Sequence, residues 1–168
     1  FFNPSNNKID EFNIAETFSK TLNLLNAQFT AKDIEIIQNI EEYKINSIEN
    51  ELIQVLVNLL NNARDALDVT ENQRRLIFIN TYSKDNILYL EIQDNAKGIP
   101  EDIIDRIFEP YFTTKHQSQG TGIGLYMSKE IIEKHLNGKL LVSNKEYVFD
   151  GISCVGACFT IGIRDDFI

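Results

Sequence analysis

The chain has 168 residues, of which 43% are hydrophobic, and this is enough to bury one sizeable core in one domain. Its formal net charge of −9 argues against a general nucleic-acid or anionic-membrane surface, because such surfaces need clustered Lys and Arg. The sequence has no run of roughly 18 apolar residues and no signal-peptide pattern. It begins with Phe1 and its only Met is Met127, so we expect a piece of a longer protein. We also expect this piece to be a cytoplasmic domain.

The first part of the chain predicts a linker, a short strand, a helix and a second strand. Residues 1–9 are polar and turn-rich and are expected to form a linker or the end of a preceding dimerisation helix, so that the domain covers residues 10–168. Glu11–Ile14 is a short strand candidate, and Ile34–Ile40 alternates as a strand with one buried face does. Between them, apolar residues at helical spacing predict a helix, namely Ala15, Phe18, Leu22, Leu25 and Phe29.

The longest predicted helix is Glu51–Asp68, which is rich in good helix formers. A turn at Asn46–Asn50 precedes it, with Ser47 or Asn50 as the expected N-terminal cap. Apolar residues recur three and four apart and form the stripe of an amphipathic helix, namely Leu52, Val55, Leu56, Leu59, Leu60, Ala63 and Leu67.

A line of polar side chains runs beside that stripe. Asn58, Asn62 and Asp65 are spaced i, i+4 and i+7, so they fall on one line along the helix. All three are unfavourable in mid-helix, because their side chains compete for backbone hydrogen bonds. Their oxygens are the ligands that Mg²⁺ prefers, and Mg²⁺ commonly adds waters and substrate phosphates. The pattern therefore indicates either a magnesium site or a solvated polar face.

The second half of the chain predicts two hairpins and two helices. The first two strands alternate and are joined by turn-forming residues 83–86. Because neighbouring strands are joined by hairpins, the order predicts an α+β fold, with a mostly antiparallel sheet and helices on one face. The expected elements are strands at Leu76–Tyr82 and Ile87–Gln93, a short helix at Glu101–Ile107, an aperiodic segment at Phe108–Gly122, a helix at Ile123–His135, and strands at Leu140–Ser143 and Gly151–Ile163 joined by a loop at Asn144–Asp150.

Asp94 ends an apolar strand and enters a turn rich in Gly and Pro, from which its carboxylate can point into a pocket at the sheet edge. A buried Asp needs a hydrogen-bond partner. The exocyclic amine of adenine fits, because it donates where guanine presents a carbonyl oxygen, and such a site rejects guanine. The alternative is an Asp that merely starts a turn.

A glycine-rich turn, Gly120–Leu125, stands immediately before a helix. Its glycines allow close backbone approach, and a helix N-terminus offers N–H groups and the positive end of its dipole to phosphates. The preceding segment, Ile107–Gln119, is long for a plain connection, and such loops are often lids. Lys115, its only Lys or Arg, could reach phosphates, while Phe108 and Phe112 either anchor the lid or simply pack in the core.

The last predicted strand carries two cysteines and a glycine. Cys154 and Cys158 lie four residues apart, about 13 Å along a strand, which is too far for a disulfide. We therefore expect two buried thiols. Gly156 suits the close approach of a ligand or of another backbone, or else a bulge or turn.

Five short motifs follow one another along the chain: NLLNNARDAL, DNAKGIP, IFEPYFTTK, GTGIGL and GACF. Their order resembles the N, G1, F, G2 and G3 boxes of sensor histidine kinases, and the resemblance runs from about Asp10 to Ile163. It implies a Bergerat-type ATP-binding fold, which is a two-layer α/β sandwich. Such a fold has a mixed five-stranded sheet with three main helices on one face, and ATP is held between the long helix and a flexible lid.

The resemblance also implies roles for single residues. Asn58 and Asn62 match the Mg²⁺ side of the site, with Asn62 the stronger candidate, and Asn58 and Lys115 match catalytic positions. Asp94 would hold the adenine amine, and Asp65 matches a position that is Lys in many of these kinases and Asp in others. The positions expected to contact ATP are Asn58, Asn62, Asp65, Asp94, Gly98, Ile99, Lys115, Gly120, Thr121, Gly122, Ile123, Gly124 and Leu125.

Two positions depart from the family pattern. Ala96 stands where the G1 box usually has its first Gly, which is compatible with the fold if φ there is negative. Ala157 stands where the G3 box often has Thr, so a hydroxyl that would support the adenine-binding Asp, usually through water, is absent. Both differences bear on nucleotide affinity rather than on the fold.

The implied activity is autophosphorylation, in which the γ-phosphoryl group of ATP passes to a histidine on a partner helix with the help of Mg²⁺. Neither His116 nor His135 has the context of a phosphoacceptor, so the acceptor is expected on upstream dimerisation helices, and His135 is interpreted as a cation at a helix end. A response regulator is the expected next partner, and no nucleic acid is expected. The fragment is expected to be monomeric and the whole protein a homodimer.

Three other functions remain open from the sequence. Related ATPases of the gyrase, chaperone and mismatch-repair type carry a general-base Glu at the position of Asn58, and Asn cannot take a proton in that way. A serine kinase of the anti-sigma-factor kind has similar boxes, although the extended F box favours the histidine kinase. A nucleotide-binding module without kinase activity is the third alternative.

Overall fold

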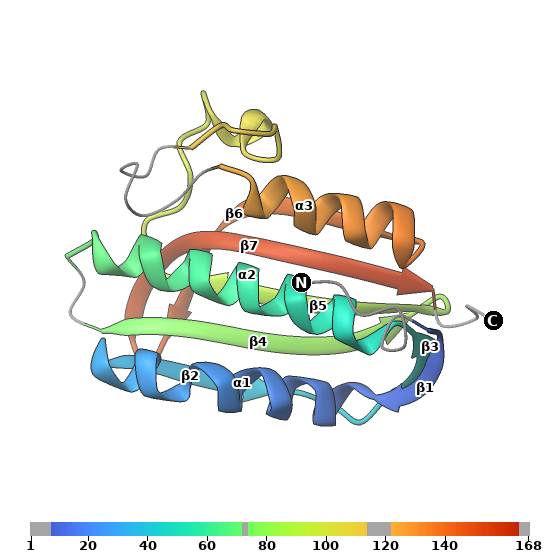
Figure 1. Ribbon diagram of the computed structural model, residues 1–168. Helices are drawn as coiled ribbons and strands as arrows, with labels where there is room; N and C mark the ends of the chain where they lie inside the picture. The colour runs from blue at the N-terminus through green and yellow to red at the C-terminus, as the bar shows by residue number, and fades with distance from the viewer. Residues whose placement is uncertain (1–7, 72–73, 114–121, 165–168) are drawn as a thin grey trace.

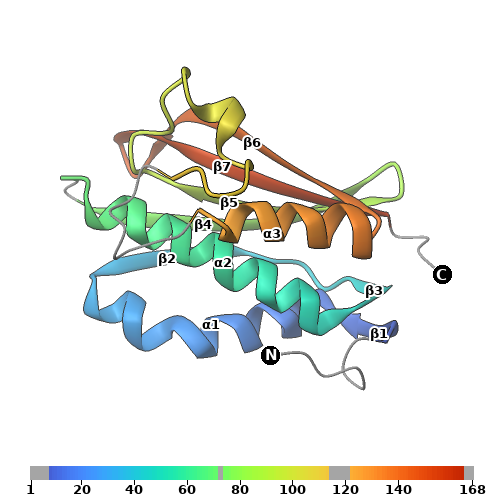
Figure 2. The ribbon, with the colours of Figure 1, turned by 45° about the horizontal axis from the view of Figure 1, so that its top comes forward.

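The computed structural model describes residues 8–71, 74–113 and 122–164. In this part of the chain, three α-helices cover one face of a five-stranded mixed sheet (Figures 1 and 2), which confirms the expected α+β sandwich. The strand order is β2 (Ile34–Asn39), β4 (Arg75–Lys84), β5 (Ile87–Asp94), β7 (Ile152–Arg164) and β6 (Gly138–Phe149). The helices are α1 (Ile14–Ala31), α2 (Glu49–Asp68) and α3 (Gly124–Glu130).

Strand pairing is parallel at one edge of the sheet and antiparallel elsewhere. β2 runs parallel to β4, and α2 lies in the crossover that a parallel pair requires. β4, β5, β7 and β6 pair antiparallel. Asp85 and Asn86, with φ of 55° and 63°, form the tight turn between β4 and β5, because both residue types tolerate the left-handed conformation. The predicted hairpin is confirmed, and its strands extend closer to the turn than the sequence pattern indicates.

The helix α1 begins one residue earlier than the sequence pattern indicates. Asn13 is its N-cap, and its Oδ1 accepts a hydrogen bond from Ala15 N at 2.9 Å. Ile14, expected in the strand, is therefore the first helical residue and is fully buried, whereas Ala15 is only half-buried. The rest of the predicted stripe lies in the core: Phe18, Leu22, Leu25 and Phe29.

The helix α2 confirms the apolar stripe but not the expected cap. All seven stripe residues are buried in the core. The N-cap is Ile48, without a side-chain hydrogen bond, so the assignment of a cap to Ser47 or Asn50 is wrong. Ser47 belongs instead to β3 (Lys44–Ser47), which pairs antiparallel with β1 (Asp10–Asn13) in a separate two-stranded sheet. Asn46 and Ser47, the last two residues of this strand, were expected in a turn.

The β6–β7 hairpin is longer than predicted, because residues 144–149 continue β6 instead of forming a loop. The chain reverses at Asp150 and Gly151, whose φ values are 49° and 74°. In Figure 1 the end of the hairpin curves behind β4. There the rings of Tyr147 and Phe149 lie 5.4 and 5.0 Å from the ring of Phe78. Aromatic packing on a distant strand thus overrides the polar local sequence.

Arg74 holds the end of this hairpin. Its guanidinium pairs with Glu35 at 2.7 Å and with Asp150 at 3.2 Å, and lies 5.5 Å from the centre of the Phe149 ring. The hydrogen bond from Arg74 lowers the pKa of the exposed Glu35 carboxyl. The hairpin tip is therefore tied to the opposite edge of the sheet.

The predicted short helix at Glu101–Ile107 is wrong in type. Only a 3₁₀ turn, η2 (Ile104–Arg106), forms there. The carbonyl of Pro100 accepts from Ile103 N and Ile104 N at 3.0 Å, and the carbonyl of Ile103 accepts from Arg106 N at 2.8 Å, so short turns follow one another instead of a continuous helix. The predicted helix at Ile123–His135 is confirmed as α3 followed by a π-helical turn, η3 (Ile131–His135).

Cys154 and Cys158 are buried and unbridged, as expected. Burial raises the pKa of the Cys158 thiol, so this thiol is kept in its neutral form. None of the helices in the described part of the chain is both long and apolar enough to cross a membrane.

Candidate functional site

A cavity of about 860 Å³ lies between α2, the loop after β5, the segment after η2 and the start of α3. This volume is within the usual range for sites that bind small molecules or cofactors. Most of the predicted site residues line it, namely Asn58, Asn62, Asp65, Gly98, Ile99, Gly122, Ile123, Gly124 and Leu125. Lys115, Gly120 and Thr121, and with them the central part of the predicted lid, lie outside the described residues.

Asp94 is hydrogen-bonded to Ala96, which lines the cavity, but Asp94 is not itself a lining residue. The side chain is 3% exposed, and its Oδ1 accepts hydrogen bonds from Ala96 N at 2.9 Å and Ala157 N at 3.2 Å. Burial raises the pKa of the Asp94 carboxyl to about 6, although the two N–H groups act in the opposite direction. No hydrogen bond to Oδ2 occurs among the described residues, so this oxygen can accept from a ligand.

The loop from Asp94 to Ile99, here called the base loop, has an unusual backbone. Lys97 and Gly98 both adopt positive φ, at 76° and 83°, whereas Ala96 does not. The departure from Gly at position 96 is therefore compatible with this backbone. Lys97 N donates to the carbonyl of Val155 at 2.9 Å, which ties the loop to β7.

Gly156 allows the close approach of another backbone, which was one of the roles predicted for it from the sequence. A Cβ added there would lie 1.6 Å from the carbonyl oxygen of Asp94, so β7 and the base loop can meet only at a glycine. The same carbonyl accepts a hydrogen bond from the Tyr147 hydroxyl at 2.8 Å. The Asp94 carbonyl is therefore held between Gly156 of β7 and the Tyr147 hydroxyl of β6.

Asn58 joins α2 to α3. Its Nδ2 donates to Ser128 Oγ at 2.9 Å. A Cβ added to Gly124 would lie 2.4 Å from Asn58 Oδ1, so the glycine leaves just enough room for this amide. Within the described part of the chain, the Asn62 side chain has no hydrogen-bond partner, and it faces the same cavity.

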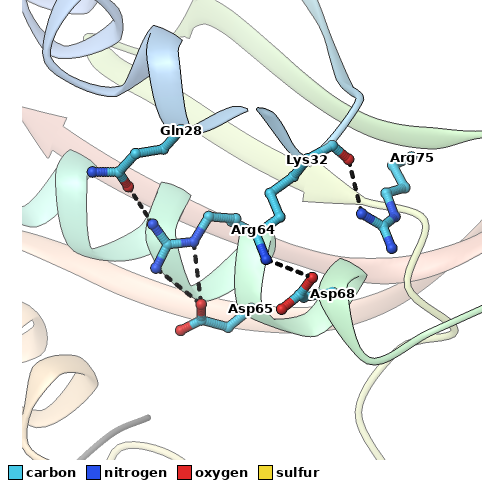
Figure 3. Close-up of polar contacts among 6 residues, drawn as sticks. All are labelled: Gln28, Lys32, Arg64, Asp65, Asp68 and Arg75. Carbon is cyan, nitrogen blue, oxygen red and sulfur yellow. Dashed lines mark hydrogen bonds and ion pairs between the residues drawn. The ribbon is translucent and has the colours of Figure 1, made fainter. Parts of the chain in front are cut away.

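Asp65 is held in an ion pair, which the sequence did not predict. Arg64 Nη2 lies 3.0 Å from Asp65 Oδ1, and the same guanidinium donates to Gln28 of α1 (Figure 3). One turn further along α2, Asp68 pairs with Lys32 at 3.0 Å (Figure 3). At Asp65, therefore, neither predicted alternative describes the polar line of α2 fully, because this carboxylate is paired with a neighbouring guanidinium.

Gly122 brings the glycine-rich turn against the segment after η2. Its φ is 76°, its carbonyl accepts from Tyr111 N at 2.9 Å, and a Cβ there would lie 2.6 Å from the carbonyl carbon of Tyr111. Phe108 makes an edge contact with Phe159 at 6.2 Å, and Phe112 lies 4.5 Å beneath the Arg106 guanidinium. Both aromatic residues therefore pack at the base of the predicted lid.

Sequence reasoning missed several residues of the site. Asn61 lines the cavity, and its buried Oδ1 has no hydrogen-bond partner among the described residues. Arg64 also lines it. Asn144 exchanges two hydrogen bonds with the backbone of Ile99. Asn61 and Arg64 are close in sequence to Asn58, Asn62 and Asp65, so their position on α2 could have indicated that they belong to the site. Asn144 was expected in a loop, and nothing in its local sequence indicated a role.

The cavity fits a nucleotide and a hard cation. Amide and carboxylate oxygens from Asn58, Asn62 and Asp65 gather on one wall, which is the donor set that Mg²⁺ accepts. Asn61 Oδ1, which no other described residue hydrogen-bonds, adds a further acceptor on the same helix. At Gly122 and Gly124 the backbone lies in the cavity wall without side chains that would exclude a phosphate chain.

Known proteins are similar to this chain in sequence and in fold. Residues 47–166 match the family described as histidine kinase-, DNA gyrase B- and HSP90-like ATPase. The chain is 42% identical over 83 residues to the sensor protein FixL of Bradyrhizobium diazoefficiens, a match that covers 49% of this chain and 16% of FixL. It is 31% identical over 139 residues to sporulation kinase E of Bacillus subtilis, which covers 82% of this chain and 18% of that kinase.

Among solved structures, the nucleotide-free catalytic domain of the histidine kinase ThkA is similar, with a TM-score of 0.77 and 26% identity over 94% of this chain and 96% of that one. The chain therefore spans less than a fifth of the two curated relatives but nearly all of the ThkA domain. The chain belongs to the family of histidine kinase-, DNA gyrase B- and HSP90-like ATPases, and it is an ATP-binding catalytic domain of the sensor histidine kinase type.

Proposed function

We propose that this domain, residues 10–168, transfers the γ-phosphoryl group of ATP to a histidine outside this chain. The observation that carries the proposal is the single cavity that joins the polar line of α2, the base loop above the buried Asp94 and the glycine-rich start of α3. The polar line of α2 suits a cation and phosphates, the base loop suits a nucleobase, and the start of α3 suits a phosphate chain.

Asp94 selects the base in this proposal. Its free Oδ2 accepts the exocyclic amine of adenine, while Oδ1 stays on Ala96 N and Ala157 N. Guanine would present a carbonyl oxygen to the same acceptor, and an unpaired buried acceptor is unfavourable. Gly98 and Ile99 form the wall beside the base.

The phosphate end of the site is assigned to α2 and the glycine-rich turn. Asn62, with Asn58, would hold Mg²⁺, which supplies neutralisation of phosphate charge. The backbone of Gly120, Gly122 and Gly124 would wrap the phosphates, with Thr121, Ile123 and Leu125 beside them and Lys115 as an added cation.

The chemistry is a phosphoryl transfer. The bond from the γ-phosphorus to the bridging oxygen breaks, a bond to an imidazole nitrogen of the acceptor forms, and ADP leaves. The protein contributes mainly position and electrostatic stabilisation, since there is little covalent chemistry for it to perform. Asn58, fixed by Ser128, supplies a neutral amide here and cannot act as a general base.

The acceptor and the partners come from elsewhere in this proposal. His135 Nδ1 lies 3.0 Å from Glu51 Oε1 at a helix end, and His116 lies outside the described residues. We place the acceptor on upstream dimerisation helices, with a response regulator as the next recipient. A solved structure of ThkA is of its complex with the response regulator TrrA, and its kinase shares the fold of this chain, with a TM-score of 0.72 and 24% identity over 94% of this chain and 42% of that one.

The test is autophosphorylation of the full-length protein that carries this domain. With ATP labelled at the γ-phosphate, we expect a phosphoryl group that is lost in acid and stable in alkali, as a phosphohistidine is. The N62A variant should incorporate none, and the domain alone should bind nucleotide without incorporating label. An acid-stable product would favour a serine kinase, and nucleotide binding without any labelled product would favour a non-kinase module.

A further inference from the structure

We infer that Asn144 is a positioning residue that holds the base loop in the conformation that binds adenine. This inference rests on the proposed function, because it concerns the affinity of the same site. Asn144 does not line the cavity, so it acts through Gly98 and Ile99, which do.

The contact between Asn144 and the base loop is reciprocal. Asn144 Oδ1 accepts from Ile99 N and Asn144 Nδ2 donates to Ile99 O, both at 2.7 Å. One side chain thus satisfies both polar groups of one loop residue, as a neighbouring strand would. The pattern also fixes which end of the amide is oxygen, since an exchanged amide would place donor against donor.

Gly98 makes the contact possible. A Cβ on Gly98 would lie 2.7 Å from Asn144 Oδ1 and 3.0 Å from Asn144 Cγ, so the loop backbone rests directly on the amide. Gly98 is therefore needed for two reasons: its φ of 83° and the space that Asn144 occupies.

The base loop needs such support because its backbone is strained. Lys97 is a side-chain-bearing residue at φ 76°, a conformation that persists only where neighbouring structure enforces it. Val155 O holds Lys97 N on one side. Asn144 holds Ile99 on the other side, 45 residues away in sequence. Without Asn144 the loop keeps the hydrogen bond of Lys97 to β7 and that of the Asp94 carbonyl to Tyr147, but loses both bonds that hold Ile99.

The remaining contact of Asn144 offers a control. Asn144 Nδ2 also lies 3.3 Å from Glu101 Oε1, which is exposed. This longer, solvated contact contributes little. E101A removes it and leaves both bonds to Ile99 in place.

The experiment is calorimetric titration of the chain with ADP, with and without Mg²⁺, together with thermal unfolding of the nucleotide-free protein. We expect N144A to raise the Kd for ADP about tenfold, which is about 1.4 kcal/mol. The factor should be the same with and without Mg²⁺, because the cation site on α2 is separate from the base loop. E101A should bind as the wild type does, and the Tm of nucleotide-free N144A should stay within a few degrees of the wild type.

A second variant keeps the test decisive if N144A does not fold. N144D has the same shape and retains the acceptor for Ile99 N, but it places a carboxylate oxygen against Ile99 O, so its loss of affinity should be at least as large. Unchanged ADP affinity in the folded N144 variants, beside a wild type that binds, would overturn the inference. A loss confined to the magnesium-dependent part of binding would overturn it as well. A folded wild type that does not bind ADP would instead contradict the proposed function.

Discussion

Asp94 is buried, although its side chain carries a carboxyl group that can ionise. Burial raises its pKa to about 6, above the ordinary value of 3.8. Between these values the folded state binds more protons than the unfolded state, so the contribution of Asp94 to stability falls as pH rises from about 4 to 6. Above that window the ionised, buried carboxylate destabilises the nucleotide-free domain.

D94N should therefore stabilise the nucleotide-free domain at pH 7.5, by about 1 to 3 kcal/mol, because it removes a buried charge and keeps an acceptor for the two N–H groups. The gain should shrink towards pH 4, where Asp94 is protonated in the wild type. Urea unfolding of both proteins at several pH values measures it. A difference in stability that does not vary between pH 4 and 7 would contradict the raised pKa.

The same substitution should lower base selectivity. An amide at position 94 can donate to the guanine carbonyl, so the ratio of ADP to GDP affinity should fall about tenfold or more. D68N is the matched control, because Asp68 pairs with Lys32 (Figure 3) and neither residue lines the cavity. Competition titration gives both affinities, and an unaltered ratio in D94N would remove Asp94 from the adenine role.

At the scale of single residues, the sequence predicts those members of the site that stand in a local pattern. Asn58, Asn62 and Asp65 share a helical line, and Gly122 and Gly124 share a glycine-rich turn. Ser128 and Asn144 could not be found in this way. Their partners lie 70 and 45 residues distant in sequence, so only the folded chain brings them together.

At the scale of secondary-structure elements, local periodicity predicts helices better than strands. The stripe of α2 is fully buried because its 3.6-residue period alone defines one face. β3 and the second half of β6 were missed because pairing with β1 and packing on Phe78 stabilise them, and neither is a local property. Element boundaries thus depend on contacts that no short window of sequence contains.

G124A tests the packing of α3 on α2. The added Cβ would lie 2.4 Å from Asn58 Oδ1, so the amide must move away from its place in the site. We expect about a tenfold loss of magnesium-dependent ADP binding with little loss of stability, since Ala favours a helix. G162A is the control, because a Cβ there meets its neighbours at ordinary contact distances of 3.4 to 3.6 Å. Equal binding by G124A and G162A would show that Asn58 tolerates displacement.

The hairpin that supports the base loop can be tested through its aromatic contacts. F78A removes the ring against which Tyr147 and Phe149 pack, and should lower the free energy of unfolding by about 2 kcal/mol, since the ring is half-buried. R74A breaks only exposed ion pairs and a cation–π contact, so its loss should stay near 1 kcal/mol or less. Urea unfolding of both variants compares their free energies of unfolding. A larger loss of stability in R74A than in F78A would show that the ion pairs hold the hairpin.

At the scale of the whole molecule, one layer of helices on one face of the sheet gathers residues from distant parts of the chain around a single cavity. The polar line of α2, the base loop and the start of α3 meet only because β5 and β7 are neighbours and α3 packs beside α2 (Figure 2). The fold class followed from the element order and from the resemblance. The small β1–β3 sheet and the curved hairpin did not, since they depend on the final packing.

The most direct test of the central claim is calorimetric titration of this chain with a non-hydrolysable ATP analogue, with and without Mg²⁺, beside the matching GTP analogue. The account predicts binding of the ATP analogue that Mg²⁺ strengthens in the wild type but not in N62A, and affinity for the GTP analogue at least about tenfold weaker. A folded chain that binds neither analogue, or that binds both equally, would contradict it.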